Sequence, residues 1–201
     1  MKKVLITIMT SVMLLTAIIT PVCAASFSDL AAEHWAYEYI TTLADAKVIN
    51  GYTDGTFRPN GTITRGEFIK LVMSSSLPEN SDVTQIVPHI NHWAAPYIKV
   101  AETYGVITEN SINQSNVDEP ITRIEMVRMI SKADIIMNDN PQQFSEKVVF
   151  MDIADLNMND IFLLRHSVSR GLIKGYDDGT FKPDRTMSRA EAATMIYRLT
   201  K

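Results

Sequence analysis

Cysteine is almost absent from this chain of 201 residues, which contains a single one, Cys23. A lone cysteine excludes a disulfide framework within the chain and a metal site built from several cysteine ligands. Basic residues are also in deficit, with 19 lysines and arginines against 23 acidic residues and a formal net charge of −4. This acidic balance argues against nucleic acid and against an anionic membrane surface as partners.

Patterns that carry catalysis or metal binding are missing as well. The chain has four histidines, which are scattered along it: His34, His89, His92 and His166. No serine, histidine and aspartate set can be placed in one cleft. A cluster of Asp177, Asp178 and Asp184 invites a calcium hypothesis, but the segment lacks the alternating oxygen ligands and the closing glutamate of an EF-hand. We therefore expect a protein that is not an enzyme and that needs no cofactor and no metal.

The first 24 residues have the pattern of a secretory signal peptide. Lys2 and Lys3 precede an apolar run over residues 4–19, and Val22-Cys23-Ala24 supplies small residues for cleavage. A transmembrane anchor is one alternative, although the run is short for a bilayer span, and a lipid-modified Cys23 is another. Cleavage after residue 24 would remove two lysines, take the net charge from −4 to −6, and leave no stable membrane anchor.

What the chain does contain is a four-residue motif that occurs three times. The copies are Thr64-Arg65-Gly66-Glu67, Thr122-Arg123-Ile124-Glu125 and Ser188-Arg189-Ala190-Glu191. In each copy a hydroxyl residue lies three positions before a glutamate, which is the spacing of a capping box at a helix N-terminus. Apolar residues at helical spacing follow each copy. The motif predicts three capped helices.

Other landmarks repeat in the same register. Trp35 and Trp93 each lie 30 residues before a motif arginine, and residues 51–57 and 175–181 share the pattern Gly-Tyr-x-Asp-Gly-Thr-Phe. A period of about 50 to 65 residues indicates a repeat protein. After the signal peptide (1–24), we expect three helix-loop-helix repeats at 26–78, 84–136 and 147–201, with linkers over residues 77–85 and 134–147.

The two tryptophans allow two interpretations. An indole at the head of an amphipathic helix has a large apolar area to bury, which favours Trp35 and Trp93 as core anchors. The other interpretation is a platform on which a sugar ring stacks. The third repeat has Asn159 at the corresponding position.

Taken together, these motifs resemble the S-layer homology domain over residues 27–199. The resemblance implies a mainly α, pseudo-threefold tripartite fold, in which the three capped helices form a central bundle and the helix-loop prongs leave grooves between repeats. It also implies a secreted, non-catalytic module of the cell wall or S-layer that binds secondary cell-wall polysaccharide, commonly with pyruvylated N-acetylmannosamine. A protein-interaction scaffold for other envelope proteins, on the same fold, is the alternative.

The resemblance also implies which residues bind the ligand. They are Trp35, Asp54, Gly55, Thr56, Arg65, Trp93, Arg123, Asp178, Gly179, Thr180 and Arg189. A helix N-terminus favours an anion, and an arginine at the first helical position adds a planar fork for a carboxylate. With the capping glutamate turned back onto the helix start, we expect the arginine side chains to point outward.

The second repeat departs most from the pattern. Residues 109–116 lack the Asp-Gly turn and the Thr-Phe pair, and Glu109 stands where the other repeats have Gly51 and Gly175. On this basis we expect the second repeat to contribute least to binding, so that Arg123→Ala weakens it less than Arg65→Ala.

Overall fold

The computed structural model describes residues 26–76, 90–138 and 149–201, so the expected signal peptide lies outside the described residues. The described chain is helical, with isolated β-bridges in place of extended strands. Its helices are α1 (Tyr37–Asp45), α2 (Arg65–Ser76), α3 (Ala95–Thr103), α4 (Arg123–Asn138), α5 (Met158–Ser169) and α6 (Arg189–Leu199). The mainly α class expected from the sequence is confirmed.

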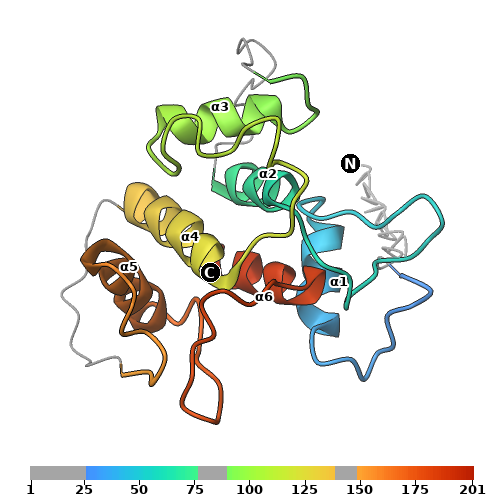
Figure 1. Cartoon of the computed structure of the whole chain (residues 1–201). Helices are drawn as coiled ribbons and strands as arrows, with labels where there is room; N and C mark the ends of the chain where they lie inside the picture. Colours follow the sequence, from blue (N-terminus) through green and yellow to red (C-terminus); the bar gives the residue numbers. More distant parts are fainter. Residues whose placement is uncertain (1–25, 77–89, 139–148) are drawn as a thin grey trace, which may run out of the picture.

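The three inner helices α2, α4 and α6 meet at the centre of the molecule, where each contacts the other two (Figure 1). Their apolar residues recur at helical spacing, so each helix presents one continuous apolar side to the bundle. Fully buried there are Phe68, Ile69 and Val72 of α2, Met126, Val127 and Ile130 of α4, and Ala192, Ala193 and Ile196 of α6. The central bundle implied by the family resemblance is therefore present.

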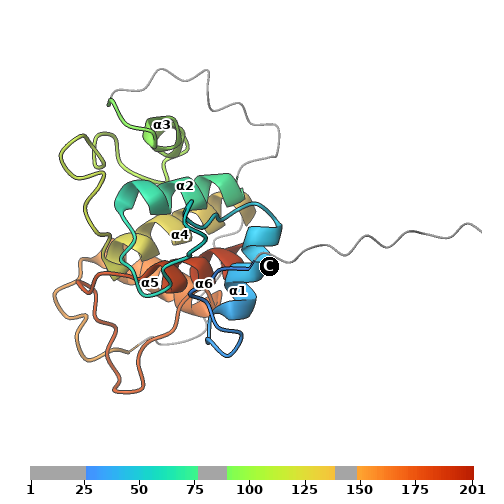
Figure 2. The same cartoon turned by 90° about the vertical axis from the view of Figure 1, so that its right-hand side faces the viewer.

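Each outer helix packs on an inner helix of a different repeat. The helix α3 lies against α2, α5 against α4, and α1 against α6 (Figures 1 and 2). The first repeat (α1 and α2), the second (α3 and α4) and the third (α5 and α6) are thus interlocked in a closed circle. In the described chain the outer and inner helices of one repeat do not contact each other, so each repeat depends on its neighbours to bury its helices, as is usual in repeat architectures.

A ring of backbone hydrogen bonds joins the segments that lead into the inner helices. The Ile63 N–H donates to the Met187 carbonyl at 3.1 Å, Met187 donates to Ile121 at 3.1 Å, and Ile121 donates to Ile63 at 3.0 Å. The three capping boxes stand next to this ring, since the amides of Thr64, Thr122 and Ser188 donate to Oε2 of Glu67, Glu125 and Glu191. The ring fixes the starts of α2, α4 and α6 at equivalent places around a pseudo-threefold axis.

Two element boundaries differ from expectation. The helix α1 begins at Tyr37, so Trp35 precedes it. The helix α4 continues to Asn138, through the start of the linker expected at Asp134. The buried Asp134 carboxylate accepts hydrogen bonds from His166 at 2.6 Å and from Arg170 at 2.9 Å, both on or next to α5. These contacts hold the last turns of α4 in helical form, and residues 139–147 of that linker lie outside the described residues.

Candidate functional site

Three cavities lie at equivalent places around the bundle, and each is built from all three repeats. One repeat supplies the motif arginine at the start of its inner helix. The next repeat supplies one side of its own inner helix and the loop that precedes that helix. The remaining repeat supplies a residue near the start of its outer helix. We name the cavities after their arginines. The Arg189 groove measures about 170 Å³, the Arg123 groove about 140 Å³ and the Arg65 groove about 310 Å³.

The helix side that lines each groove starts at the capping glutamate. It continues with residues three, four and, in two grooves, seven positions further on, which lie on the same side of a helix. These residues are Glu67, Lys70 and Leu71 in the Arg189 groove; Glu191, Thr194, Met195 and Arg198 in the Arg123 groove; and Glu125, Arg128, Met129 and Lys132 in the Arg65 groove. The glutamate therefore caps the helix and lines the groove at the same time.

The motif arginines do not point outward, and that expectation is wrong. Arg123 and Arg189 are only 6% and 8% exposed, because each guanidinium reaches across to the loop of the next repeat and lies against two aromatic rings. The rings are Tyr52 and Phe57 for Arg189, and Tyr176 and Phe181 for Arg123, with distances of 4.7 to 4.8 Å from Cζ to the ring centroids. Cation–π attraction and burial hold these arginines at the groove wall.

Backbone carbonyls of the same loops complete the arginine contacts. Arg189 donates from Nε to the Phe57 carbonyl at 2.9 Å and from Nη2 to the Asn50 carbonyl at 3.2 Å. Arg123 donates from Nη2 to the carbonyl of Lys174, the residue equivalent to Asn50. Burial lowers the pKa of the Arg123 guanidinium, which nevertheless stays charged at neutral pH.

The grooves differ in how many carboxylates neutralise the arginine. Among the described residues, Arg189 forms one ion pair, with Oε1 of Glu67 at 3.3 Å. Arg65 forms two, from Nε to Oε1 of Glu125 and from Nη1 to Oε2 of Glu119, both at 3.0 Å. The Arg65 guanidinium is therefore the most fully neutralised of the three.

Arg123 stands at the other extreme. The capping glutamate of its groove, Glu191, directs Oε1 to Arg185 instead, and no carboxylate of the described residues pairs with Arg123. Two buried polar atoms in this region, Nε of Arg123 and the Tyr176 hydroxyl, lack a hydrogen-bond partner within the described chain. Both atoms are buried and Tyr176 does not line the cavity, so the capacity of this groove for an anion depends on the Arg123 guanidinium, which pairs with no carboxylate of the described residues.

The tryptophans line two of the grooves rather than the core. Trp35 is 58% exposed in the Arg123 groove and Trp93 is 56% exposed in the Arg189 groove, so their interpretation as core anchors is wrong. The histidine before each tryptophan turns the chain, since Nδ1 of His34 accepts the Ala36 backbone N–H and Nδ1 of His92 accepts that of Ala94, both at 3.1 Å. The His34 and His92 rings then lie 5.6 and 5.1 Å from the indoles. This turn immediately precedes the outer helix and leaves the indole exposed to solvent.

The loop tips lie away from the cavities, although Asp54, Gly55, Thr56, Asp178, Gly179 and Thr180 were expected to bind the ligand. Asp54 accepts the backbone N–H and the hydroxyl of Thr56 at 3.0 and 2.6 Å, and Asp178 does the same with Thr180 at 3.0 and 2.5 Å. Gly55 and Gly179 have φ of 80° and 78°, which only glycine adopts readily. The structure gives these residues a role in shaping the loops that hold the arginines.

Hydrogen bonds to the two aspartates also lower their pKa values. The Thr56 hydroxyl and then Arg58 hold the pKa of Asp54 at about 2, below its ordinary value of 3.8. The Thr180 hydroxyl and Lys182 lower the pKa of Asp178 to about 2 in the same way.

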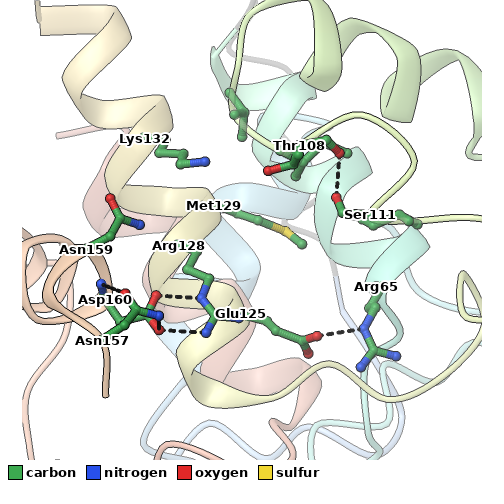
Figure 3. A pocket seen from close by; sticks show the side chains of 13 residues that line it. Arg65, Thr108, Ser111, Glu125, Arg128, Met129, Lys132, Asn157, Asn159 and Asp160 are labelled. Atoms are coloured by element: carbon green, nitrogen blue, oxygen red, sulfur yellow. Dashed lines mark hydrogen bonds and ion pairs between the residues drawn. The ribbon is translucent and has the colours of Figure 1, made fainter. Parts of the chain in front are cut away.

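The Arg65 groove combines both departures from the repeat pattern (Figure 3). Ser111 and Ile112 of the altered segment in the second repeat line this groove, and Asn159 takes the place of the indole. No aromatic ring of the described residues lies over the Arg65 guanidinium. Arg128 and Asp160 instead join the groove walls by two hydrogen bonds of 2.7 Å, as the dashed lines in Figure 3 show.

The sequence analysis missed the aromatic rings that lie against the Arg123 and Arg189 guanidinium groups, and it missed the charged residues on the inner helices. A sequence signal for these rings was present, because the repeated loop pattern contains them as Tyr52, Phe57, Tyr176 and Phe181. The helix residues could have been found by counting three, four and seven positions on from each capping glutamate. What the sequence does not reveal is which repeat's loop meets which arginine.

Comparison with known proteins supports the repeat interpretation. The model of the S-layer homology domain matches residues 26–69 and 167–193. S-layer protein EA1 of Bacillus anthracis is 31% identical over 97% of this chain and 22% of its own length. An uncharacterized cell wall amidase of the same organism is 32% identical over 85% of this chain and 31% of its own length.

An amylopullulanase of Thermoanaerobacterium thermosulfurigenes is 28% identical over 87% of this chain but only 9% of its own length. The chain thus spans less than a third of each of these relatives. The second repeat lies between the two segments that the family model matches, and its helices α3 and α4 occupy the positions equivalent to α1, α2, α5 and α6. The chain therefore belongs to the S-layer homology domain family, with three tandem repeats closed around one central bundle.

Proposed function

We propose that this cell-surface chain is a non-catalytic anchoring module that binds a secondary cell-wall polysaccharide through the grooves between its repeats. The sugar we expect carries a carboxylate, as a pyruvate ketal does. Family membership indicates the location at the cell surface. The matches to the amidase and the amylopullulanase cover only a small part of those proteins, which agrees with a shared attachment module.

One observation carries the proposal. In two grooves a buried arginine, a capped helix start and a half-exposed indole converge on one cavity from three different repeats. An arginine fork and a helix N-terminus favour a carboxylate, while an exposed indole offers a flat apolar surface to a sugar ring. Cavities of about 140 and 170 Å³ suit one terminal sugar residue rather than a long segment of polymer.

The local charge supports an anionic ligand in spite of the acidic composition. The Arg123 groove is lined by Lys174 and Arg198 in addition to Arg123, and its capping glutamate is neutralised by Arg185. Positive charge concentrated at one cavity attracts an anion even where the net charge of the protein is negative.

Sedimentation with purified cell walls tests the proposal. We expect the chain to sediment with walls that retain their non-peptidoglycan polymer and to stay in solution after that polymer has been removed chemically. Binding to the stripped walls at unchanged strength would reject the polysaccharide as the ligand.

A protein-interaction scaffold is the second candidate, and one surface favours it. A cavity of about 260 Å³ at the ends of α2 and α4 is lined mainly by apolar side chains. Tyr104, Ile136 and Met137 at this place are each more than 40% exposed, and exposed apolar clusters often mark protein contacts. Substitution of Ile136 and Met137 by serine would abolish binding to an envelope protein and leave wall sedimentation unchanged.

A further inference from the structure

One position at the rim of each groove carries a different charge in each repeat. Each motif arginine donates its backbone N–H to a backbone carbonyl of the next repeat at 2.8 to 3.1 Å. The accepting carbonyls belong to Gly61 for Arg189, to Glu119 for Arg65 and to Arg185 for Arg123. Gly61, Glu119 and Arg185 therefore occupy equivalent places, four residues before the motif arginine of their own repeat. We call them the rim residues.

The rim residues decide how many carboxylates meet the groove arginine. Glu119 adds its own carboxylate to Arg65, which already pairs with Glu125. Gly61 adds nothing, so that Arg189 keeps one pair with Glu67. Arg185 binds Glu191, and that carboxylate is the one which would otherwise stand opposite Arg123.

We infer that the rim residue sets the strength with which each groove attracts a carboxylate ligand, in the order Arg123, Arg189, Arg65. The inference rests on the proposed function for the identity of the ligand, and it assigns Arg185 and Glu119 as specificity-determining residues. Neither Glu119 nor Arg185 is among the residues that line the corresponding cavity. Glu119 therefore acts through Arg65, and Arg185 acts through Glu191.

Electrostatics gives the direction of the effect. A carboxylate already bound to an arginine competes with an incoming anion and repels it, and the interaction is stronger near buried groups than in open solvent. Arg123 lines its groove and pairs with no carboxylate of the described residues, because Glu191 pairs with Arg185. Because Glu119 is 62% exposed, solvent screens its effect, and we expect differences of about tenfold rather than a thousandfold.

The ranking can be measured with a simple anion. Nε–Hε resonances of the three arginines are followed by NMR while sodium pyruvate is added at constant ionic strength, with methyl pyruvate as the uncharged control. We expect Arg123 to respond at a concentration about tenfold lower than Arg65, which corresponds to about 1.4 kcal/mol, with Arg189 between them. A response of Arg65 before Arg123, or equal responses of all three, would overturn the inference.

Rescue separates a charge effect from a structural one. Arg185→Ala releases Oε1 of Glu191, which can then reach Arg123 as Glu67 reaches Arg189. We expect the affinity of the Arg123 groove for pyruvate to fall about tenfold. Adding Glu191→Gln should restore it, since glutamine keeps an oxygen for the Ser188 amide but carries no charge. An unchanged Arg185→Ala variant, or a failure of rescue, would contradict the assignment.

The reverse experiment places an arginine at the rim position of the Arg65 groove, as the Arg123 groove has with Arg185. Glu119→Arg should raise the response of Arg65 to pyruvate about tenfold, and no gain would count against the inference. Arg165→Ala is the matched control, because Arg165 is exposed on α5 and lines none of the three grooves. Sedimentation with walls is scored separately: if the pyruvate ranking holds while wall binding fails, the ligand of the proposed function is wrong and the role of the rim residues stands.

Discussion

The Arg123 groove and the Arg65 groove are equivalent in position but opposite in chemistry. The first has two aromatic rings against its arginine, an exposed indole and no carboxylate on the guanidinium within the described chain. The second has an altered loop, Asn159 and two carboxylates on the guanidinium. Each groove is thus assembled from three repeats, so the residues of one repeat alone do not predict the chemistry of one groove.

From this arrangement we expect the opposite of the affinity ranking drawn from the sequence. The sequence-based ranking linked the altered loop of the second repeat to Arg123 of the same repeat. In the structure that loop lies next to Arg65, whose Nη1 donates to the Asn116 carbonyl at 3.4 Å, while Arg123 lies against the intact loop of the third repeat. Two departures, in the second and third repeats, therefore fall on one groove and leave two grooves complete.

The largest expected difference is between two alanine variants. Arg123→Ala should weaken binding of a pyruvylated fragment by about 1.5–3 kcal/mol, the range for losing hydrogen bonds to a charged group, while Arg65→Ala should change it little. Calorimetry gives the affinities, and thermal unfolding shows that both variants are folded. Arg123→Lys should recover only part of the loss, because lysine lacks the planar fork. A larger loss for Arg65→Ala would restore the ranking drawn from the sequence.

A second difference concerns the stability of the loops. A Cβ at Gly51 would lie 2.4 Å from Phe27 Cε1 and 2.7 Å from the Thr56 carbonyl oxygen, so Gly51→Ala should lower the free energy of unfolding by about 1–3 kcal/mol. Glu109→Ala, at the equivalent position of the second repeat, should change it by less than about 0.5 kcal/mol. Urea unfolding measures both, and equal effects would show that the two loops are packed alike.

The indoles offer a smaller contrast. Trp35→Ala should weaken glycan binding by about 1 kcal/mol, a typical value for an aromatic contact, without changing stability, because the side chain is largely exposed. Asn159→Trp tests the converse by supplying an indole to the Arg65 groove. We expect no gain in affinity for an anionic glycan from this change, since Glu119 and Glu125 still occupy Arg65. A gain would mean that stacking outweighs charge.

The smallest expected effect is a local response to acid. Asp54 and Asp178 have pKa values lowered to about 2, so their contribution to loop order is complete above pH 4 and is lost as the pH falls toward 2. The corresponding turn of the second repeat uses Asn113, whose Oδ1 accepts the Ser115 amide at 3.0 Å and does not titrate. NMR should show the Thr56 and Thr180 amides changing in this interval, with Ser115 unaffected. Simultaneous changes at all three would indicate global unfolding instead.

The parts of the fold that could be predicted are those with local signals. A capping box lies within four residues and a helical apolar pattern within ten or twelve, so the starts of α2, α4 and α6 and their buried sides were correct from sequence. The extent of α4 was missed because Asp134 is held by His166 and Arg170, more than 30 positions away.

The site depends on pairings between repeats, which no local pattern encodes. The arginines and tryptophans chosen from the sequence line the three cavities, but the arginines were expected to point outward and the tryptophans were expected in the core. Both errors have the same origin. Arg123 and Arg189 are positioned by aromatic rings in the next repeat, and Arg65 is positioned by two carboxylates of the next repeat. The tryptophans are positioned by the preceding histidine, which turns the chain before the helix.

The most direct measurement is a crystal structure of the chain with a pyruvylated sugar at a concentration that fills only the strongest site. We predict density in the Arg123 groove, with the ketal carboxylate on the Arg123 guanidinium and the sugar ring against Trp35. Density in the Arg65 groove with the Arg123 groove empty, or a ligand bound away from all three grooves, would contradict it.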